Sequence, residues 1–585
     1  EYLGNLRSAV SYLASRAPCR KTPRFEYSPC DLGSPNRKTS ATYISPYLSI
    51  PRLLFAQTPF FDSKSFTYLS TTYQSLQMLR LPKVSRVLGR RFRSAFVAAP
   101  RLTTTDLNRS TIEAKYAVRG KIPIRADELR QEIKQNEKLA FDEIVSANIG
   151  NPQQLDQTPL SWYRQTLSLL QYPVLIDKLQ KMDETTRNAL YPADVIERAS
   201  KLLKSLGSVG AYSLSQGDQV VRESVANFIA KRDGYAASAD NIFLTGGASA
   251  AVLYLIQVLS QGGNLGFLIP IPQYPLYTAS IALNNATPIG YFLDEANDWS
   301  TDPKQIRRLI KENTDRGVDV KSLVIINPGN PTGAILLESD IAELIDIAAE
   351  HGLVVIADEV YQENVFHGKF VSAKKVLAKL LEKDPEQYGN VQLVSLHSTS
   401  KGVSGECGQR GGYMELVGFS KDVQDVIFKL ACINLCPVVT GQALVELMIN
   451  PPQKGSPSYD LYHKEISKIH EALDERATRL HEAFSKMSDV ECNKPQGAMY
   501  LFPSLNFKES TYPQLFKKCE ADDLTVDEFY CSELLENTGI CCVPGSGFGQ
   551  VPGTHHVRTT FLPPGTEWID KWEKFHEKFV KEYKI

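Results

Sequence analysis

A stretch of small and polar residues, "STSKGVSGECGQRGGY" at 398–413, holds one lysine and one arginine. An amine in such a stretch can attack a carbonyl carbon and hold a ligand covalently. A guanidinium beside it can bind a phosphate through two parallel hydrogen bonds. A solvated turn is the alternative interpretation of Lys401 and Arg410, so other parts of the chain must decide between the two.

A second stretch, "TGGASAAVLYLIQVL" from Thr245, predicts a strand end, a glycine turn and an apolar helix. The backbone N–H groups of Gly247, Ala248 and Ser249 would then lie at a helix N-terminus, which is an anion site. Ser398 and Arg410 could contact the same phosphate. The pattern G-x-x-x-x-G-K-[ST] is absent from the sequence, so a nucleoside triphosphate loop is not predicted.

An acid completes the set, because Asp358 directly follows the apolar run "LVVIA". A carboxylate at the end of a buried strand is costly unless it meets a cation or a hydrogen-bond donor. Asn330 and Tyr361 supply donors, although "NPGNPTG" alone fits an ordinary multiple turn equally well. A phosphate site, a buried acid and a reactive lysine together match the needs of pyridoxal phosphate, whose ring nitrogen the acid would keep protonated.

The elements that must position these residues are five short apolar runs, each continuous rather than alternating. Such runs are typical of parallel strands covered on both faces by helices, which predicts an α/β fold. In open sheets of this class, ligands bind beyond the carboxyl ends of the strands, so the stretches above should converge on one crevice. The runs are Ile242 to Thr245, Leu265 to Ile269, Leu323 to Ile326, Leu353 to Ala357 and Leu393 to Leu396.

The motifs "NPGNPTG", "ADEVYQ", "HSTSKG" and "RGGY" resemble those of the fold type I aminotransferases, which depend on pyridoxal phosphate. Longer segments narrow the resemblance to the alanine aminotransferases: "SANIGNPQQLDQTPLSWYRQTL", "GAYSLSQGDQVVRE", "GECGQRGGY" and "INPPQKGSPSYDLYHKEI". The resemblance runs from about Gly120 to the C-terminus. It implies a large domain with a mostly parallel sheet flanked by helices, plus a smaller α/β domain.

The resemblance also implies roles for individual residues. Lys401 would carry the cofactor and move a proton, and Asp358 would pair with the pyridine nitrogen. Asn330 and Tyr361 would hold the ring hydroxyl oxygen. Tyr274, in "PQYPLY", would stack on the ring, and a core aromatic is the alternative for it.

Three further residues are assigned by the same resemblance. Arg558 would grip the substrate carboxylate as a bidentate fork, where a lone arginine could otherwise be a surface residue on a strand. Gly150 would let the backbone close over the substrate, since it has no Cβ. Tyr212 would reach the phosphate of the partner subunit, which implies a homodimer with shared active sites.

The implied reaction is alanine plus 2-oxoglutarate to pyruvate plus glutamate, in two halves with ping-pong kinetics. One alternative in the same subgroup uses glyoxylate as the amino acceptor, and another is a pyridoxal-phosphate lyase. A catalytically silent module would lack Lys401, Asp358 or Arg558, and all three are present. No residue is assigned to the second carboxylate of glutamate.

Composition limits the partners. The net charge of −1 and the absence of an apolar run of transmembrane length predict no binding to nucleic acid and no membrane span. The ten cysteines show no C-x-x-C pair and no metal-ligand spacing with histidine, so neither a metal site nor a disulfide framework is expected. Small-molecule amino acids and 2-oxo acids are the expected ligands.

The first hundred residues differ from the rest, with sixteen Lys/Arg against four Asp/Glu up to Arg101. From Met78 the sequence reads "MLRLPKVSRVLGRRFRSAFVAAPRLTTT", an amphipathic, Arg-rich and acid-poor pattern. It predicts a mitochondrial transit peptide at 78–105 and a matrix location, with a basic tail and a cytoplasmic location as the alternative. Residues 1–77 are then either a longer leader or translated sequence upstream of the true start, and their status stays open.

The similar part of the chain is expected to divide in two. Residues 190–449 would form the large cofactor domain. Residues 106–189, with the N-terminal arm, and residues 450–585 would form the small domain.

Overall fold

The structure is a computed structural model that describes residues 102–114, 120–135, 138–260 and 264–585. The predicted leader at 1–77 and nearly all of the predicted transit peptide lie outside these residues. The described residues belong to one folded unit. The division of this unit into a large and a small domain stays a prediction.

The centre of the unit is a seven-stranded sheet with the order β2-β8-β7-β6-β5-β3-β4. All neighbouring strands are parallel except β8, which runs antiparallel to both β2 and β7. The mostly parallel α/β architecture predicted from the sequence is therefore confirmed. The strands are β2 (Ile242–Thr245), β3 (Leu265–Ile271), β4 (Thr287–Phe292), β5 (Asp319–Ile326), β6 (Val354–Asp358), β7 (Gln392–Ser398) and β8 (Gly412–Val417).

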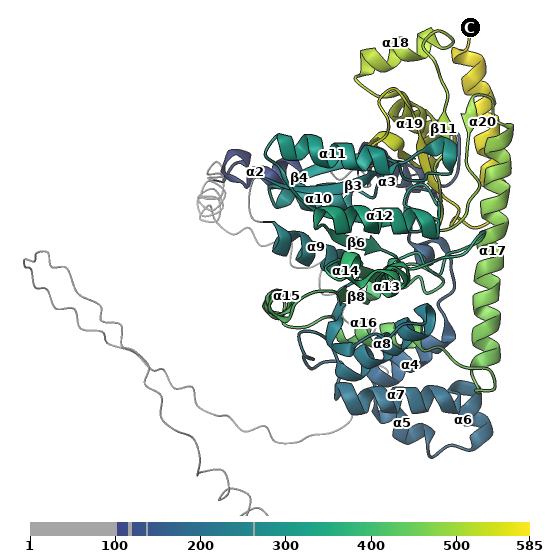
Figure 1. Cartoon of the computed structure of the whole chain (residues 1–585). Coiled ribbons are helices and arrows are strands. Elements are labelled where there is room, and N and C mark those ends of the chain that lie inside the picture. The colour runs from purple at the N-terminus through teal and green to yellow at the C-terminus, as the bar shows by residue number, and fades with distance from the viewer. Residues whose placement is uncertain (1–101, 115–119, 136–137, 261–263) are drawn as a thin grey trace, which may run out of the picture. The chain divides into compact units, whose positions relative to one another are not determined.

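Helices cover both faces of this sheet, which is why its strands are apolar on both sides (Figure 1). On one face lie α9 (Ala248–Leu259), α10 (Leu276–Leu283) and α15 (Lys421–Ile433). On the other lie α11 (Pro303–Asp315), α12 (Glu338–His351), α13 (Ala373–Lys383) and α14 (Pro385–Tyr388).

A helical layer packs beside strands β2 and β8. Its helices are α4 (Ser161–Gln171), α5 (Val174–Leu179), α6 (Glu184–Leu190), α7 (Ala193–Leu206), α8 (Gln219–Asp233) and α16 (Val439–Ile449). Side chains of all of these except α6 form one apolar core with residues of the two strands.

The C-terminal part of the chain builds its own core around α17 and α20. Figure 1 shows α17 running from the side of α4–α7 to the side of α18–α20. Its helices are α17 (Tyr459–Lys486), α18 (Pro513–Asp522), α19 (Val526–Thr538) and α20 (Glu567–Tyr583). Its strands are β9 (Val490–Glu491), β10 (Tyr500–Leu501), β11 (Ser504–Leu505), β12 (Ile540–Cys541), β13 (Val543–Pro544) and β14 (Val557–Thr560).

The start of the described chain joins this C-terminal part. Strand β1 (Val145–Ser146) pairs in parallel with β12, and helix α3 (Lys121–Lys134) packs near α19. The remaining elements are one short helix, α2 (Arg109–Glu113), and 3-10 turns. These turns are η1 (Thr104–Asp106), η3 (Pro152–Leu155), η4 (Ala239–Asn241), η5 (Glu295–Asn297), η6 (Cys407–Gln409) and η7 (Gly545–Phe548).

All five predicted strands are confirmed, as β2, β3, β5, β6 and β7. Strands β4 and β8 were not predicted. Strand β4 lies at the sheet edge and carries Pro288 and Gly290, and β8 begins at a glycine pair, so both lack a continuous apolar run. Within the described residues, no helix combines the length and apolar character needed to cross a membrane.

Candidate active site

Residues that follow β2, β5, β6 and β7 line one cavity of 350 Å³. All but two of the predicted site residues line it: Gly150, Ala248, Ser249, Tyr274, Asn330, Asp358, Tyr361, Ser398, Lys401, Arg410 and Arg558. Gly247 borders it, directly before α9. Tyr212 is outside its lining and is 78% exposed. The expected convergence on one crevice is confirmed for the residues in this lining.

Lys401 lies three residues beyond the end of β7. Its Nζ donates a hydrogen bond of 3.0 Å to the backbone oxygen of Gly150 and lies 5.9 Å from the centre of the Tyr361 ring. Within the described residues, no carboxylate forms an ion pair with this amine. The amine is held by the Gly150 oxygen but has no negatively charged partner there, so it can react with a ligand in the cavity.

Asp358 ends β6 and is buried, and its two oxygens have different surroundings. Oδ2 accepts a hydrogen bond of 2.9 Å from the Tyr277 hydroxyl, whereas Oδ1 has no partner within the described residues. Burial raises the pKa of this carboxyl above its usual value, while the Tyr277 hydroxyl, the nearby Val360 backbone N–H and the charge of Lys401 act against that rise. A buried acceptor without a donor points to a ligand that supplies one.

The N-terminus of α9 forms one end of the cavity. Gly247, at φ +83°, precedes the helix without a side-chain cap, so first-turn N–H groups face outward. A Cβ on Gly247 would lie 2.6 Å from Nη2 of Arg410, which explains the glycine. Arg410 Nη2 donates to the Gly246 oxygen at 2.9 Å and to the Ser249 hydroxyl at 3.2 Å. These groups form a cationic concavity suited to a phosphate.

Ser398 and Ser400 lie beside this concavity. The Ser398 hydroxyl accepts a hydrogen bond of 3.3 Å from the Ser400 backbone N–H. The Ser400 hydroxyl accepts one of 3.4 Å from Nη1 of Arg410. Ser400 therefore belongs with the residues that are predicted to bind the phosphate, although sequence reasoning did not select it.

Tyr361 and Tyr500 form a buried pair in the cavity wall. The Tyr361 hydroxyl donates to the Tyr500 hydroxyl at 3.3 Å. Burial opposes ionisation of Tyr500, but the charges of Lys401 and Arg558 outweigh it and lower the pKa of this phenol. A Cβ on Gly150 would collide with the Tyr500 hydroxyl, so only glycine lets the two segments meet.

Arg558 is on β14 and only 1% exposed, so it is not the surface residue of the alternative interpretation. Its Nη1 donates to Asn330 Oδ1 at 3.2 Å, its Nη2 to the Asn148 backbone oxygen, and its Nε has no partner within the described residues. The guanidinium lies between the rings of Tyr500 and Phe548, at 4.4 and 4.5 Å. A buried cation without a carboxylate calls for an anionic ligand.

Sequence reasoning did not select Tyr277, Ser400 or Tyr500, which contact the predicted site residues. Tyr277 could have been found, because it lies in "PQYPLY", the same short stretch as the predicted Tyr274. Tyr500 contacts Tyr361 across 139 positions of chain, and no local pattern signals such a contact.

The chain is similar to known proteins in sequence and in fold. Residues 182–567 match the model of the family "Aminotransferase class I and II". The mitochondrial alanine aminotransferase of Saccharomyces cerevisiae is 55% identical over 84% of this chain and 82% of its own length. An alanine aminotransferase from Pyrococcus furiosus shares the fold, with a TM-score of 0.62 and 24% identity over 81% of this chain and all of that one.

A second protein of Saccharomyces cerevisiae, named an inactive alanine aminotransferase, is 51% identical over 84% of this chain and 96% of its own length. High identity therefore includes a relative without activity. The chemistry of this chain has to be argued from its own cavity.

Proposed function

This chain belongs to the class I and II aminotransferases, which use pyridoxal phosphate, and we propose that it exchanges amino groups between L-alanine and 2-oxoglutarate. Pyruvate and L-glutamate are the products, in two half-reactions with ping-pong kinetics. The observation that carries the proposal is that Lys401, Asp358 and Arg558 line the same 350 Å³ cavity. Amino acids and 2-oxo acids are its ligands.

The residues present fit the cofactor. Asp358 Oδ1 is a buried acceptor without a donor, as a protonated pyridine nitrogen requires. The uncapped start of α9, with Ser249, Ser398 and Arg410, would hold the phosphate. When bound, the cofactor supplies an electron sink for the negative charge left on the substrate α-carbon.

Each side chain then has one task. Lys401 Nζ would hold the cofactor covalently and, once displaced by the substrate amine, take up the proton from the substrate α-carbon and return it. Asp358 would keep the ring nitrogen protonated by its negative charge. Asn330 and Tyr361 would bind the ring hydroxyl oxygen, and Tyr274 would stack on the ring.

Substrate binding would rest on Arg558 and Gly150. The buried guanidinium would bind the α-carboxylate of either substrate through two parallel hydrogen bonds. The carboxylate would supply the negative charge that the guanidinium lacks. The backbone at Gly150, which already contacts Lys401 Nζ, would close over the bound acid. Closing of the backbone over the bound acid would exclude water from the place where the proton moves.

We also propose a homodimer with shared sites. Tyr212 is exposed and would reach the phosphate in a second copy of the chain. Its loop is joined to the loop of Leu435, since the Ser215 hydroxyl donates to the Leu435 backbone oxygen at 2.5 Å. Leu214 and Leu435 on these loops are 62% and 54% exposed, and Ile433 at the end of α15 is 73% exposed. Together they form an apolar surface suited to a second copy.

A mitochondrial location is proposed from two observations. The relative from Saccharomyces cerevisiae described above is named mitochondrial, and the sequence from Met78 has the pattern of a transit peptide. Residues 78–105 fused to a fluorescent protein should direct it to mitochondria. A diffuse cytoplasmic signal would contradict the proposal.

The first experiment is a spectroscopic titration of the full-length holoenzyme. L-alanine alone should remove the visible cofactor band, and 2-oxoglutarate should restore it, whereas Lys401→Ala should turn over in neither half-reaction. Restoration by glyoxylate but not by 2-oxoglutarate would favour the glyoxylate-dependent alternative. Product release from alanine without any 2-oxo acid would indicate a lyase.

A further inference from the structure

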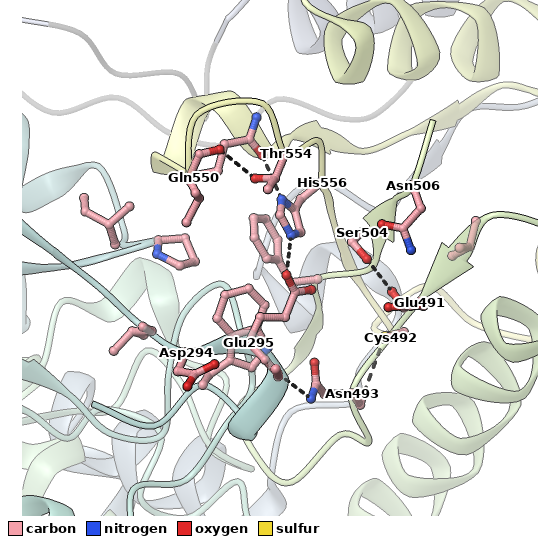
Figure 2. Close-up of a pocket in the computed structure, with 18 of the residues that line it drawn as sticks. Asp294, Glu295, Glu491, Cys492, Asn493, Ser504, Asn506, Gln550, Thr554 and His556 are labelled. Atoms are coloured by element: carbon pink, nitrogen blue, oxygen red, sulfur yellow. Dashed lines mark hydrogen bonds and ion pairs between the residues drawn. The ribbon is translucent and has the colours of Figure 1, made fainter. Parts of the chain in front are cut away.

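A second cavity, of 740 Å³, lies beside the C-terminal strands (Figure 2). One wall is the turn Asp294–Trp299, which follows β4, and the other carries His556, which directly precedes β14. Figure 2 shows the His556 ring in direct contact with the Glu295 carboxylate, joined by a dashed line. His556 Nε2 and Glu295 Oε2 are 3.1 Å apart.

The turn that carries Glu295 is fixed in place. Asp298 and Trp299 both have positive φ, 53° and 59°, which is unfavourable for side chains of this kind. Asn493 holds the turn from the C-terminal part, because its Nδ2 donates to the Glu295 backbone oxygen at 3.2 Å and to Asp298 Oδ1 at 3.0 Å. Trp299 is buried. Glu295 is therefore presented from a rigid support.

His556 is held equally firmly. Its Nδ1 lies 2.9 Å from Gln550 Oε1, and its ring stacks on Phe502 with centroids 4.7 Å apart and an interplanar angle of 1°. Only 2% of the residue is exposed. The ring is therefore fixed by contacts on its face and at both of its nitrogens.

His556 and Arg558 are two residues apart on one extended segment, so their side chains lie on the same face of it. Both reach across to the segments beyond the central sheet: His556 to Glu295 after β4, and Arg558 to Asn330 after β5.

A chain of rings joins the same two residues. Phe502, stacked on His556, lies 6.1 Å from the Phe548 ring, which in turn lies 4.5 Å from the Arg558 guanidinium. His556 and Arg558 are therefore connected both by the backbone and by a continuous series of packed rings.

We propose that the pair of His556 and Glu295 is a positioning device that sets where Arg558 stands in the active-site cavity. The proposal rests on the proposed role of Arg558 in binding the substrate carboxylate. Neither member of the pair lines the active-site cavity, so neither touches the substrate. Since one arginine serves both substrates, loosening the pair weakens the binding of alanine and 2-oxoglutarate by the same factor.

The test compares Glu295→Gln and His556→Leu with wild type and with Glu491→Gln. Glu491 is a matched control, a carboxylate in the lining of the same cavity that forms no ion pair with His556. The holoenzymes are assayed for kcat and KM with both substrates. The affinity for 2-oxoglutarate is measured independently by calorimetry, and unfolding temperature reports on the fold.

Glu295→Gln and His556→Leu should raise KM for both substrates by the same factor, about three- to ten-fold, with kcat nearly unchanged. Glu491→Gln should behave as wild type. His556→Gln, which can still donate to Glu295, should recover part of the affinity lost in His556→Leu. These results together would support the positioning role.

Three outcomes overturn the proposal: an unchanged KM with a lower unfolding temperature, a KM change for only one substrate, or equal calorimetric affinities in all variants. A wild-type enzyme inactive with alanine is a separate result. A loss of 2-oxoglutarate affinity in the variants would then still support the positioning device, while the proposed amino donor would be wrong.

Discussion

At the scale of single residues, the two oxygens of Asp358 define what the cavity can hold. One accepts a hydrogen bond from Tyr277, and the other is buried with no hydrogen-bond partner within the described residues. Arg558 likewise has an unsatisfied polar atom, but on a cation: its Nε is buried with no hydrogen-bond partner within the part of the chain that the structure describes. A complete ligand for this cavity therefore carries a donor at one end and a carboxylate at the other.

Asp358→Asn tests the acid. The variant keeps the shape and the Tyr277 contact but loses the negative charge that favours a protonated ring nitrogen, so kcat should fall about 100- to 1,000-fold. Steady-state kinetics and the visible spectrum of the holoenzyme are the measurements. Tyr277→Phe, which keeps the charge, should lose less than about tenfold. An asparagine variant with wild-type kcat would remove Asp358 from the mechanism.

Arg558→Lys tests whether two parallel hydrogen bonds bind the substrate carboxylate. Lysine retains the charge but cannot form two parallel hydrogen bonds, so kcat/KM should fall roughly 100-fold with alanine and with 2-oxoglutarate alike. The comparison of the two substrates is essential. A loss confined to 2-oxoglutarate would mean that Arg558 meets the second carboxylate rather than the α-carboxylate.

Sequence alone predicts the residues whose chemistry is unusual for their local surroundings, such as Lys401 in a run of small residues and Asp358 after an apolar strand. It does not predict partners such as Tyr500, which is an ordinary tyrosine until the chain brings it to Tyr361. The sequence therefore reveals the charged residues of the site, but not the neutral side chains that surround them.

At the scale of elements, the sheet places a second set of charges on the face away from the cavity. Glu359, next to Asp358, accepts hydrogen bonds from the Ala373 backbone N–H at 2.7 Å and the Ser395 hydroxyl at 2.5 Å, which join β6 to α13 and β7. Burial raises the pKa of Glu359 to about 7, against the charge of Arg232. Asp358 and Glu359 thus serve opposite faces of one strand end.

Glu359→Gln should change the pH dependence of stability. Between pH 4.5 and about 7 the folded protein binds the Glu359 proton more tightly than the unfolded chain does, so the free energy of unfolding falls as pH rises. The full effect is about 3 kcal/mol. Glutamine has no such titration, so the unfolding temperature of the variant, relative to wild type, should increase from pH 5 to pH 8. A difference that is constant with pH would contradict this.

The strands that sequence predicts are those with apolar side chains on both faces. Strand β8 does not have this pattern, because it contains the buried residue Glu415, which is paired with Lys374 on α13 at 2.5 Å. A charged residue inside a central strand is compatible with burial only through that distant partner, which local sequence does not show.

At the scale of the whole molecule, the proposed dimer can be tested directly. Light scattering on the full-length protein should give twice the 65.2 kDa mass of one chain. Leu435→Asp, which places a charge on the exposed apolar loops, should shift the protein toward the monomer and weaken cofactor retention, because Tyr212 would lose its site in the second copy. A wild-type monomer with full activity would contradict shared sites.

The pairing of β1 with β12 has a consequence for the order of events during synthesis. Gly150, which receives the hydrogen bond of Lys401, lies just after β1, and β1 is held by residues 540 and 541. A nascent chain that ends before this point cannot form that pairing. The wall of the cavity at Gly150 is therefore completed only after the ribosome has delivered residues 540 and 541, almost 400 positions after Gly150 itself.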